Sequence, residues 1–301
     1  MSNELIKYTF QALGSRCEIV LDEVHADLAE ECFLLAKHEV ERIEKKYSRY
    51  RDDSIVSLIN ASAGKSSILC DAETCDLIRF GQSLYEVSGG LFDMTAGSLS
   101  RAWDFRSETI PADAELEFFR SLVGWSKVEW DGEHIGLPLP GMQIDFGGFG
   151  KEYAVDRVST LLRARGIKAG YVNFGGDIAV MGPKADQSPW LLGIQDPRKS
   201  GQVVATIPVF IGALASSGDY ERFFEKEGKR YCHVIHPKTG YPVTYWRSIS
   251  VLASQVVIAG GYTTVAMLME QDGLKFLQSS GLEFFAIDQQ GAMYRNEGKA
   301  T

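Results

Sequence analysis

A chain of 301 residues with 45% hydrophobic and 24% charged residues has the composition of an ordinary globular protein, which excludes disordered, collagen-like and coiled-coil proteins. The formal net charge of -9 and the absence of a basic cluster predict that nucleic acid is not a partner. No stretch has the length of a membrane span and no cationic segment followed by an apolar run opens the sequence, so we expect a cytoplasmic protein with no membrane partner.

The first half of the chain predicts a strand, two helices and a hairpin. Alternating apolar and polar residues over 6–22 are typical of a strand, interrupted at Gly14. Apolar residues spaced by three and four predict helices over 28–47 and 72–87, and a Ser-Gly-Gly stop ends the second helix. An Asp-Gly pair between two apolar-rich runs predicts a hairpin over 126–137.

The second half predicts a strand over 142–146, a glycine turn over 147–150 and an amphipathic helix over 151–165. We then expect strands over 169–180, 189–194, 203–211 and 248–253, a loop-rich stretch over 215–245, helices over 257–270 and 273–279, and a terminal hairpin over 283–294. The sequence contains no obvious repeat and no Pro/Gly/Ser linker, which predicts one unit over 1–301.

Four polar or glycine-rich turns are the candidate ligand-binding segments. The amides of Gly147–Gly150 at a helix start suit a phosphate, but the same glycines also suit a tightly packed turn. Asn173–Asp177 allows either close approach of the backbone to a ligand or a β-bulge, and Ser216–Tyr220 offers either ligand groups or ordinary turn chemistry. His233 and His236, with a proline following, favour a general base or a hydrogen-bonding loop over a metal-binding pair.

In chain order these segments resemble the ApbE family of FAD:protein FMN transferases, from residue 12 to residue 264. The matching blocks are Ala12–Ser15, Ser48–Asn60, Gly90–Thr95, Ile144–Asp156, Asn173–Asp177, Ser217–Tyr220 and His233–Pro242. The resemblance implies an α+β fold similar to the T-fold, with mixed or antiparallel sheets packed with helices, in a single ApbE-like flavin transferase domain over 1–301.

The resemblance implies transfer of the FMN moiety of FAD to a Thr or Ser hydroxyl of an acceptor flavoprotein with a flavinylation motif, with release of AMP. FAD is then the substrate and Mg²⁺ the cofactor. His233 occupies the family's histidine position and is the implied catalytic base. The positions implied to contact FAD are Leu13, Tyr50, Leu91, Phe92, Asp93, Asp145, Lys151 and Ile235. Tyr50 and Phe92 suit flat rings, and Lys151 suits phosphate charge. The implied metal ligands are a main-chain oxygen of Gly148 and the hydroxyl of Thr264.

The implied metal site departs from the family pattern at two positions. The family has an Asp four residues before the Thr ligand, where this chain has Gly260, and weaker Mg²⁺ binding is expected without that carboxylate. Glu152 stands where the family commonly has Gly, and of two orientations, toward the metal or toward solvent, solvent is favoured. A Gly260→Asp substitution is expected to raise magnesium dependence and turnover. A non-catalytic FAD-binding protein and an FAD pyrophosphatase are the alternative functions.

The five cysteines contain no CxxC pair and predict reduced, mostly buried thiols. Many members of the family are exported lipoproteins, whereas this sequence shows no leader segment. We therefore expect a cytoplasmic acceptor such as a soluble reductase.

Overall fold

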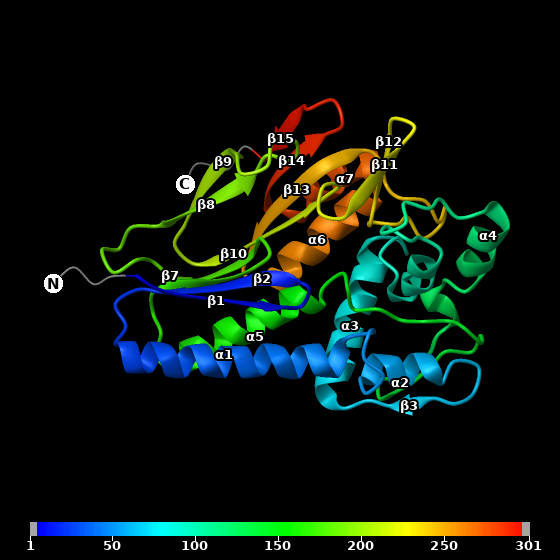
Figure 1. Cartoon of the computed structure of the whole chain (residues 1–301), viewed down its shortest axis with the longest axis horizontal. Helices are drawn as coiled ribbons and strands as arrows, with labels where there is room; N and C mark the ends of the chain where they lie inside the picture. Colours follow the sequence, from blue (N-terminus) through cyan, green and yellow to red (C-terminus); the bar gives the residue numbers. More distant parts are fainter. Residues whose placement is uncertain (1–4, 297–301) are drawn as a thin grey trace.

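An eight-stranded sheet forms the centre of the computed structural model, which describes residues 5–296 (Figure 1). Every pair of neighbouring strands is antiparallel. In spatial order the strands are β1 (Ile6–Ala12), β2 (Ser15–Leu21), β6 (Gly170–Phe174), β7 (Asp177–Gly182), β10 (Gly212–Gly218), β13 (Trp246–Ala253), β14 (Glu283–Asp288) and β15 (Met293–Arg295). The expected α+β class with antiparallel sheets is confirmed.

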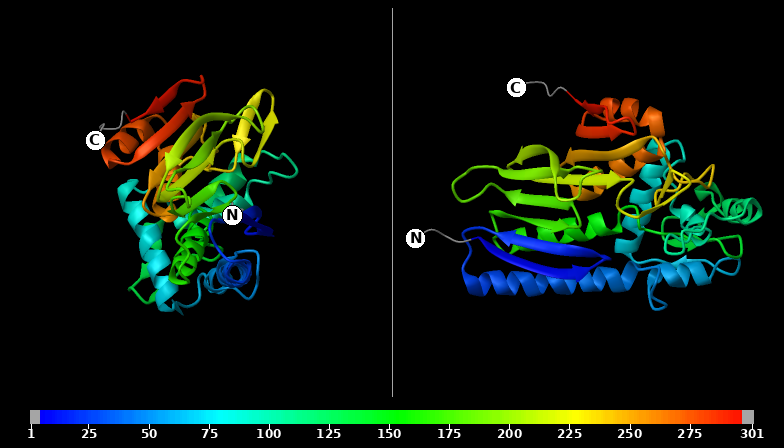
Figure 2. Two further views of the ribbon diagram at one scale, coloured as in Figure 1. Left: turned by 90° about the vertical axis from the view of Figure 1, so that its left-hand side faces the viewer. Right: turned by 45° about the horizontal axis from the view of Figure 1, so that its top comes forward.

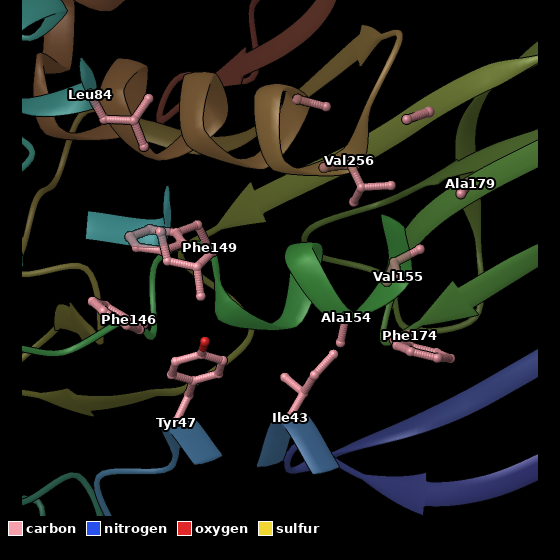
Figure 3. Close-up of a cluster of buried hydrophobic side chains, with 14 of the residues drawn as sticks. Ile43, Tyr47, Leu84, Phe146, Phe149, Ala154, Val155, Phe174, Ala179 and Val256 are labelled. Atoms are coloured by element: carbon pink, nitrogen blue, oxygen red, sulfur yellow. The ribbon is translucent and has the colours of Figure 1, made fainter. Parts of the chain in front are cut away.

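Helices cover one face of this sheet. Both α5 (Gly150–Ala164) and α6 (Val256–Leu268) pack directly on strands, α1 (Ala26–Tyr47) packs on α5, and α3 (Ala72–Val87) contacts α6 (Figure 1). Figure 3 shows the apolar interior between them. Phe146 and Phe149, which flank the glycine turn, lie there with ring centroids 5.2 Å apart, and the Tyr47 ring lies 5.6 Å from Phe146. The core therefore fixes the turn that precedes α5.

Two further apolar clusters flank the main core. On the other face of the sheet, the hairpin of β8 (Trp190–Gln195) and β9 (Val203–Val209) packs on β2, β7 and β10. A cluster around Trp103 joins η1 (Met94–Arg101), α4 (Asp113–Ser121) and the hairpin of β11 (Phe223–Lys226) and β12 (Lys229–Cys232). Figure 2 shows that the ribbon of these elements lies toward one end of the molecule. The smaller elements are α2 (Ile55–Ala61), β3 (Ile68–Leu69), η2 (Trp125–Lys127), β4 (Glu129–Trp130), β5 (His134–Gly136), η3 (Glu270–Asp272) and α7 (Gly273–Ser280).

The predicted long helices and the hairpins near 131 and 290 are confirmed, whereas three of the predicted strands differ from the structure. Residues 6–22 form the hairpin of β1 and β2, and 169–180 contains parts of two strands, β6 and β7. Residues 142–146 are extended but join no sheet, because the Asn60 side chain bonds the N–H and C=O of Ile144, and Asp145 N–H donates to Met94 O. The stretch predicted as loop over 215–245 holds β11 and β12.

Within residues 5–296, none of the helices combines the length and the apolar character that crossing a bilayer requires. All five cysteines are free and buried, which confirms the prediction of reduced thiols.

Candidate active site

Three turns come together around the ammonium group of Lys151, which lies at the start of α5. Its ammonium lies 2.8 Å from Asp177 Oδ2 on β7. A Cβ added to Gly175 would lie 3.5 Å from Lys151 Nζ and 2.9 Å from the Cβ of Ser15, so the turn before β7 and the turn before β2 both approach this ammonium. Burial acts to lower the pKa of Lys151, but the charges of Asp177 and Glu152 outweigh it and hold the pKa above its ordinary value.

The turn between β1 and β2 adopts a rare backbone conformation. Leu13 has φ of 53° and Gly14 has φ of 67°, a left-handed region that residues other than glycine seldom occupy. The N–H of Leu13 donates to Glu44 Oε1 on α1 at 2.9 Å, which holds the turn in place. Strained positions of this kind cluster at functional sites.

The two aspartates implied to contact FAD are held by the protein's own groups. Asp145 Oδ1 accepts from the N–H of Gly147 at 2.9 Å, and its Oδ2 lies 3.3 Å from Arg49 Nη1. Asp93 caps η1, and its Oδ2 accepts from the N–H of Trp125 at 2.9 Å. Both carboxylates therefore orient the turns that carry them.

The two aromatic residues implied to contact FAD differ in accessibility. Tyr50 is 76% exposed, with the Arg49 guanidinium 4.9 Å from its ring centroid, so one face is open to a flat ligand. Phe92 is only 6% exposed, its ring lies 6.1 Å from that of Phe149, and a Cβ on Gly148 would come within 2.9 Å of it. Phe92 supports the glycine turn from the core and has no free face for stacking on a flavin.

His233 follows β12 and lies within reach of the Lys151 charge. Its backbone N–H donates to Arg222 O at 3.0 Å, while its ring Nδ1 is buried and has no hydrogen-bond partner within the described part of the chain. Burial, followed by the positive charges of Arg222 and Lys151, lowers the pKa of His233 to about 4. The imidazole is therefore neutral at neutral pH and able to accept a proton.

A cavity of about 350 Å³ brings the segment that carries Asp93 beside the loop after β12. Its lining residues are Tyr85, Gly90, Asp93, Arg120, Val123, Gly124, Pro237 and Lys238. The loop is closed by a β-bridge between Ile235 and Pro242, while Leu91 packs on the main core. The cations of Arg120 and Lys238 were not predicted as site residues, because only the fold places them at this cavity.

The expectation that Glu152 faces solvent is wrong. Glu152 is 8% exposed and lies against α6, where a Cβ on Gly260 would be 2.6 Å from Glu152 Cγ. Burial, followed by the Asp177 carboxylate, raises the pKa of Glu152 to about 7, and Lys151 acts in the opposite direction. An aspartate introduced at position 260 alone would collide with Glu152, which removes the basis for expecting a gain from that single substitution.

The remaining groups implied to bind a metal lie on α6 and in the turn just before α5. Thr264 follows Gly260 by one turn of α6, and its Oγ1 lies 3.5 Å from Ser217 Oγ of β10. The main chain of Gly148 precedes α5. Residues 5–296 contain no group of three or more His, Cys, Asp or Glu side chains able to hold a metal ion. A metal here would rely on one carboxylate with hydroxyl and carbonyl oxygens, donors that suit Mg²⁺. The family block around Ser217 was the signal for that neighbouring hydroxyl.

The fold and the site define an α+β protein with glycine turns at a helix start, a geometry suited to a phosphate-bearing ligand. Residues 13–286 match the ApbE family, and the chain belongs to that family. A Treponema pallidum protein is 32% identical over 82% of this chain and 72% of its own length, and a Vibrio cholerae protein is 29% identical over 82% and 76%. Both relatives are FAD:protein FMN transferases.

Solved structures agree with this assignment. The ApbE protein of Thermotoga maritima superposes with a TM-score of 0.91 at 29% identity, covering 98% of this chain and 97% of that chain. The flavin transferase ApbE of Vibrio cholerae superposes with a TM-score of 0.87 at 25% identity, with 98% of each chain covered. The resemblance inferred from the separate blocks is confirmed in both sequence and fold.

Proposed function

We propose that this protein binds FAD and transfers its FMN moiety to a Thr or Ser hydroxyl of an acceptor flavoprotein with a flavinylation motif, releasing AMP. The observation that carries the proposal is that family blocks far apart in sequence meet where buried polar atoms have no hydrogen-bond partner among residues 5–296. These atoms include His233 Nδ1 and Glu152 Oε2. Buried polar groups in native proteins are almost always satisfied, so a ligand that completes them is expected.

The FAD contacts are assigned to Leu13, Tyr50, Leu91, Phe92, Asp93, Asp145, Lys151 and Ile235. Lys151 and the amides at the start of α5 suit the diphosphate, since both present positive charge at the same turn. The exposed ring of Tyr50 suits stacking on a flat ring, whereas the buried ring of Phe92 leaves its main chain as the contacting part.

In the proposed reaction the acceptor hydroxyl oxygen attacks the phosphorus on the FMN side, the bond from that phosphorus to the AMP oxygen breaks, and AMP leaves. His233 takes the proton of the hydroxyl, which its neutral imidazole permits. Gly148 and Thr264 would help to hold Mg²⁺, which supplies neutralisation of phosphate charge when bound. The rest of the rate enhancement comes from positioning by the turns around Lys151.

We assign the protein and its acceptor to the cytoplasm, and we treat residues 1–301 as one flavin transferase domain. Five free, buried cysteines suit a reducing compartment. A soluble reductase is the kind of acceptor that this assignment favours. One main apolar cluster draws residues from both halves of the described chain, which supports a single domain.

The test is to incubate the purified protein with FAD and Mg²⁺ and an acceptor that carries the motif. The matched control acceptor has its Thr or Ser replaced by Ala. AMP is measured by chromatography, and covalent flavin by fluorescence of the denatured acceptor in a gel. We expect AMP and covalent flavin together, only with the intact motif. AMP without covalent flavin would indicate an FAD pyrophosphatase, and bound FAD without either product would indicate a non-catalytic FAD-binding protein.

A further inference from the structure

Gly260 and Glu152 form one packed pair across the interface of α5 and α6. A Cβ added to Gly260 would lie 2.6 Å from Glu152 Cγ, 3.0 Å from Oε1 and 3.1 Å from Cδ. Glycine in a helix interior is less stable than alanine. Packing explains the glycine at position 260, because Glu152 fills the space that a side chain there would need.

Asp156 sets the register of this pair. Its Oδ1 and Oδ2 accept hydrogen bonds from the N–H groups of Val256 and Val257, each at 2.9 Å, and so satisfy the amino end of α6 from a neighbouring helix. Glu152 precedes Asp156 by one turn, and Gly260 follows Val256 by one turn. An antiparallel pairing of the helices therefore brings Glu152 opposite Gly260.

One oxygen of the Glu152 carboxylate has no hydrogen-bond partner among residues 5–296. The residue is 8% exposed, and Oε2 is buried without a hydrogen bond in the part of the chain that the structure describes. The charges acting on it are the carboxylates of Asp177 and Asp156 and the ammonium of Lys151. That ammonium already pairs with Asp177 at 2.8 Å. The anionic form of a carboxylate buried without a counterion of its own is strongly disfavoured, and a divalent cation beside Glu152 would stabilise that form.

We propose that Glu152 supplies, from α5, the carboxylate ligand of a divalent metal site. The other donors are the Thr264 hydroxyl, one turn beyond Gly260, and the main-chain oxygen of Gly148 before α5. The inference rests on the proposed function, which assigns the metal to the FAD diphosphate. Because Gly260 has no side chain, Glu152 has room to reach α6. Compared with the family pattern, the carboxylate is then supplied by α5 instead of α6.

The first test measures metal binding without FAD. Mn²⁺ alone is titrated into metal-free protein, and free Mn²⁺ is followed by electron paramagnetic resonance, with Mg²⁺ added in competition. The Glu152→Gln variant keeps the shape of the side chain and removes its charge, so the helices stay packed. We expect its affinity for Mn²⁺ to fall at least about tenfold, the order of loss seen when a metal site's supporting groups are removed.

The second test moves the carboxylate back across the interface. In the double variant Glu152→Gly/Gly260→Asp, the clashing Cγ is gone and the new carboxylate stands one turn before Thr264. We expect Mn²⁺ affinity within about fivefold of wild type, whereas Gly260→Asp alone gives no gain because of the clash. The matched control is Glu221→Gln, an exposed carboxylate whose charge also acts on Lys151, and its effect should stay below about fivefold.

Two results overturn the inference: a Glu152→Gln protein that binds Mn²⁺ like wild type, or a wild-type protein that leaves Mn²⁺ free at millimolar concentration. If the double variant fails to fold, the isosteric Glu152→Gln variant still decides. The proposed function fails separately. If Mn²⁺ binding depends on Glu152 but neither AMP nor covalent flavin forms, the transferase proposal is refuted while the assignment of Glu152 as a metal ligand is supported.

Discussion

The packing of Gly260 against Glu152 predicts how a single methyl group changes stability in two backgrounds. In Gly260→Ala, the added Cβ would stand 2.6 Å from Glu152 Cγ, well inside the contact distance of about 3.5–4.0 Å between carbon atoms. In Glu152→Ala, the three atoms that this Cβ would meet are absent. Gly260→Ala should therefore act in opposite directions in the wild-type and Glu152→Ala proteins.

The magnitudes follow from two opposing effects. Overpacking in a buried interface costs about 1–3 kcal/mol, and replacing glycine by alanine in a helix interior returns about 1 kcal/mol. We expect Gly260→Ala to lower the free energy of unfolding by about 1 kcal/mol in the wild-type protein and to raise it by about 1 kcal/mol in Glu152→Ala, a coupling of about 2 kcal/mol.

The assay is urea unfolding followed by circular dichroism for the wild type, both single variants and the double variant, with EDTA present so that metal binding does not contribute. Matching slopes of the unfolding free energy against urea would show that the four proteins expose the same surface. Equal effects of Gly260→Ala in the two backgrounds would refute the packing argument, since they would place Glu152 away from position 260.

Three other groups give testable expectations. His233→Gln should abolish most FMN transfer while FAD binding persists, and the His233 imidazole, assigned in NMR spectra by its loss in that variant, should titrate near pH 4; titration near its ordinary value would contradict the burial argument. Lys151→Met should weaken FAD binding by about tenfold or more in flavin fluorescence titrations, because it removes a charged partner of phosphate and leaves Asp177 unpaired. Arg42 and other partners outweigh burial and lower the pKa of Glu73 below its ordinary 4.5, so its stabilisation is present above about pH 4.5 and lost as the pH falls. Glu73→Gln should cost roughly 1–2 kcal/mol at pH 7 and progressively less below pH 4.5 in urea unfolding, and a loss independent of pH would count against the ion pair.

The long helices were predictable from sequence because their apolar spacing is local. The helix over 72–87 begins and ends as predicted, since Asp71 caps it and Ser-Gly-Gly follows it. The strand predicted over 142–146 failed because its alternation is real but its partners are an Asn60 side chain and a single Met94 carbonyl. Whether an extended segment joins a sheet depends on which strand lies beside it, and a local pattern does not contain that information.

The candidate site was predictable as a set of segments but not as a geometry. Ordered blocks led to Lys151, His233 and Thr264 without any contact being known. The burial of the Phe92 ring under Gly148 could not be predicted, because aromatic residues suit both a ligand and a core. The orientation of Glu152 depends on how α5 packs against α6, which a single helix pattern leaves undetermined.

The residues at positions 152 and 260 can be interpreted only together. A glycine at 260 by itself indicates a lost ligand, and a glutamate at 152 by itself indicates a solvated helix start. The short distances between them exclude two side chains of ordinary size at once, since one occupies the space of the other. Within this fold a carboxylate can therefore enter from α5 or from α6, with glycine opposite it. In the proposed metal site, the carboxylate is supplied by α5 instead of α6, and both positions differ from the family pattern.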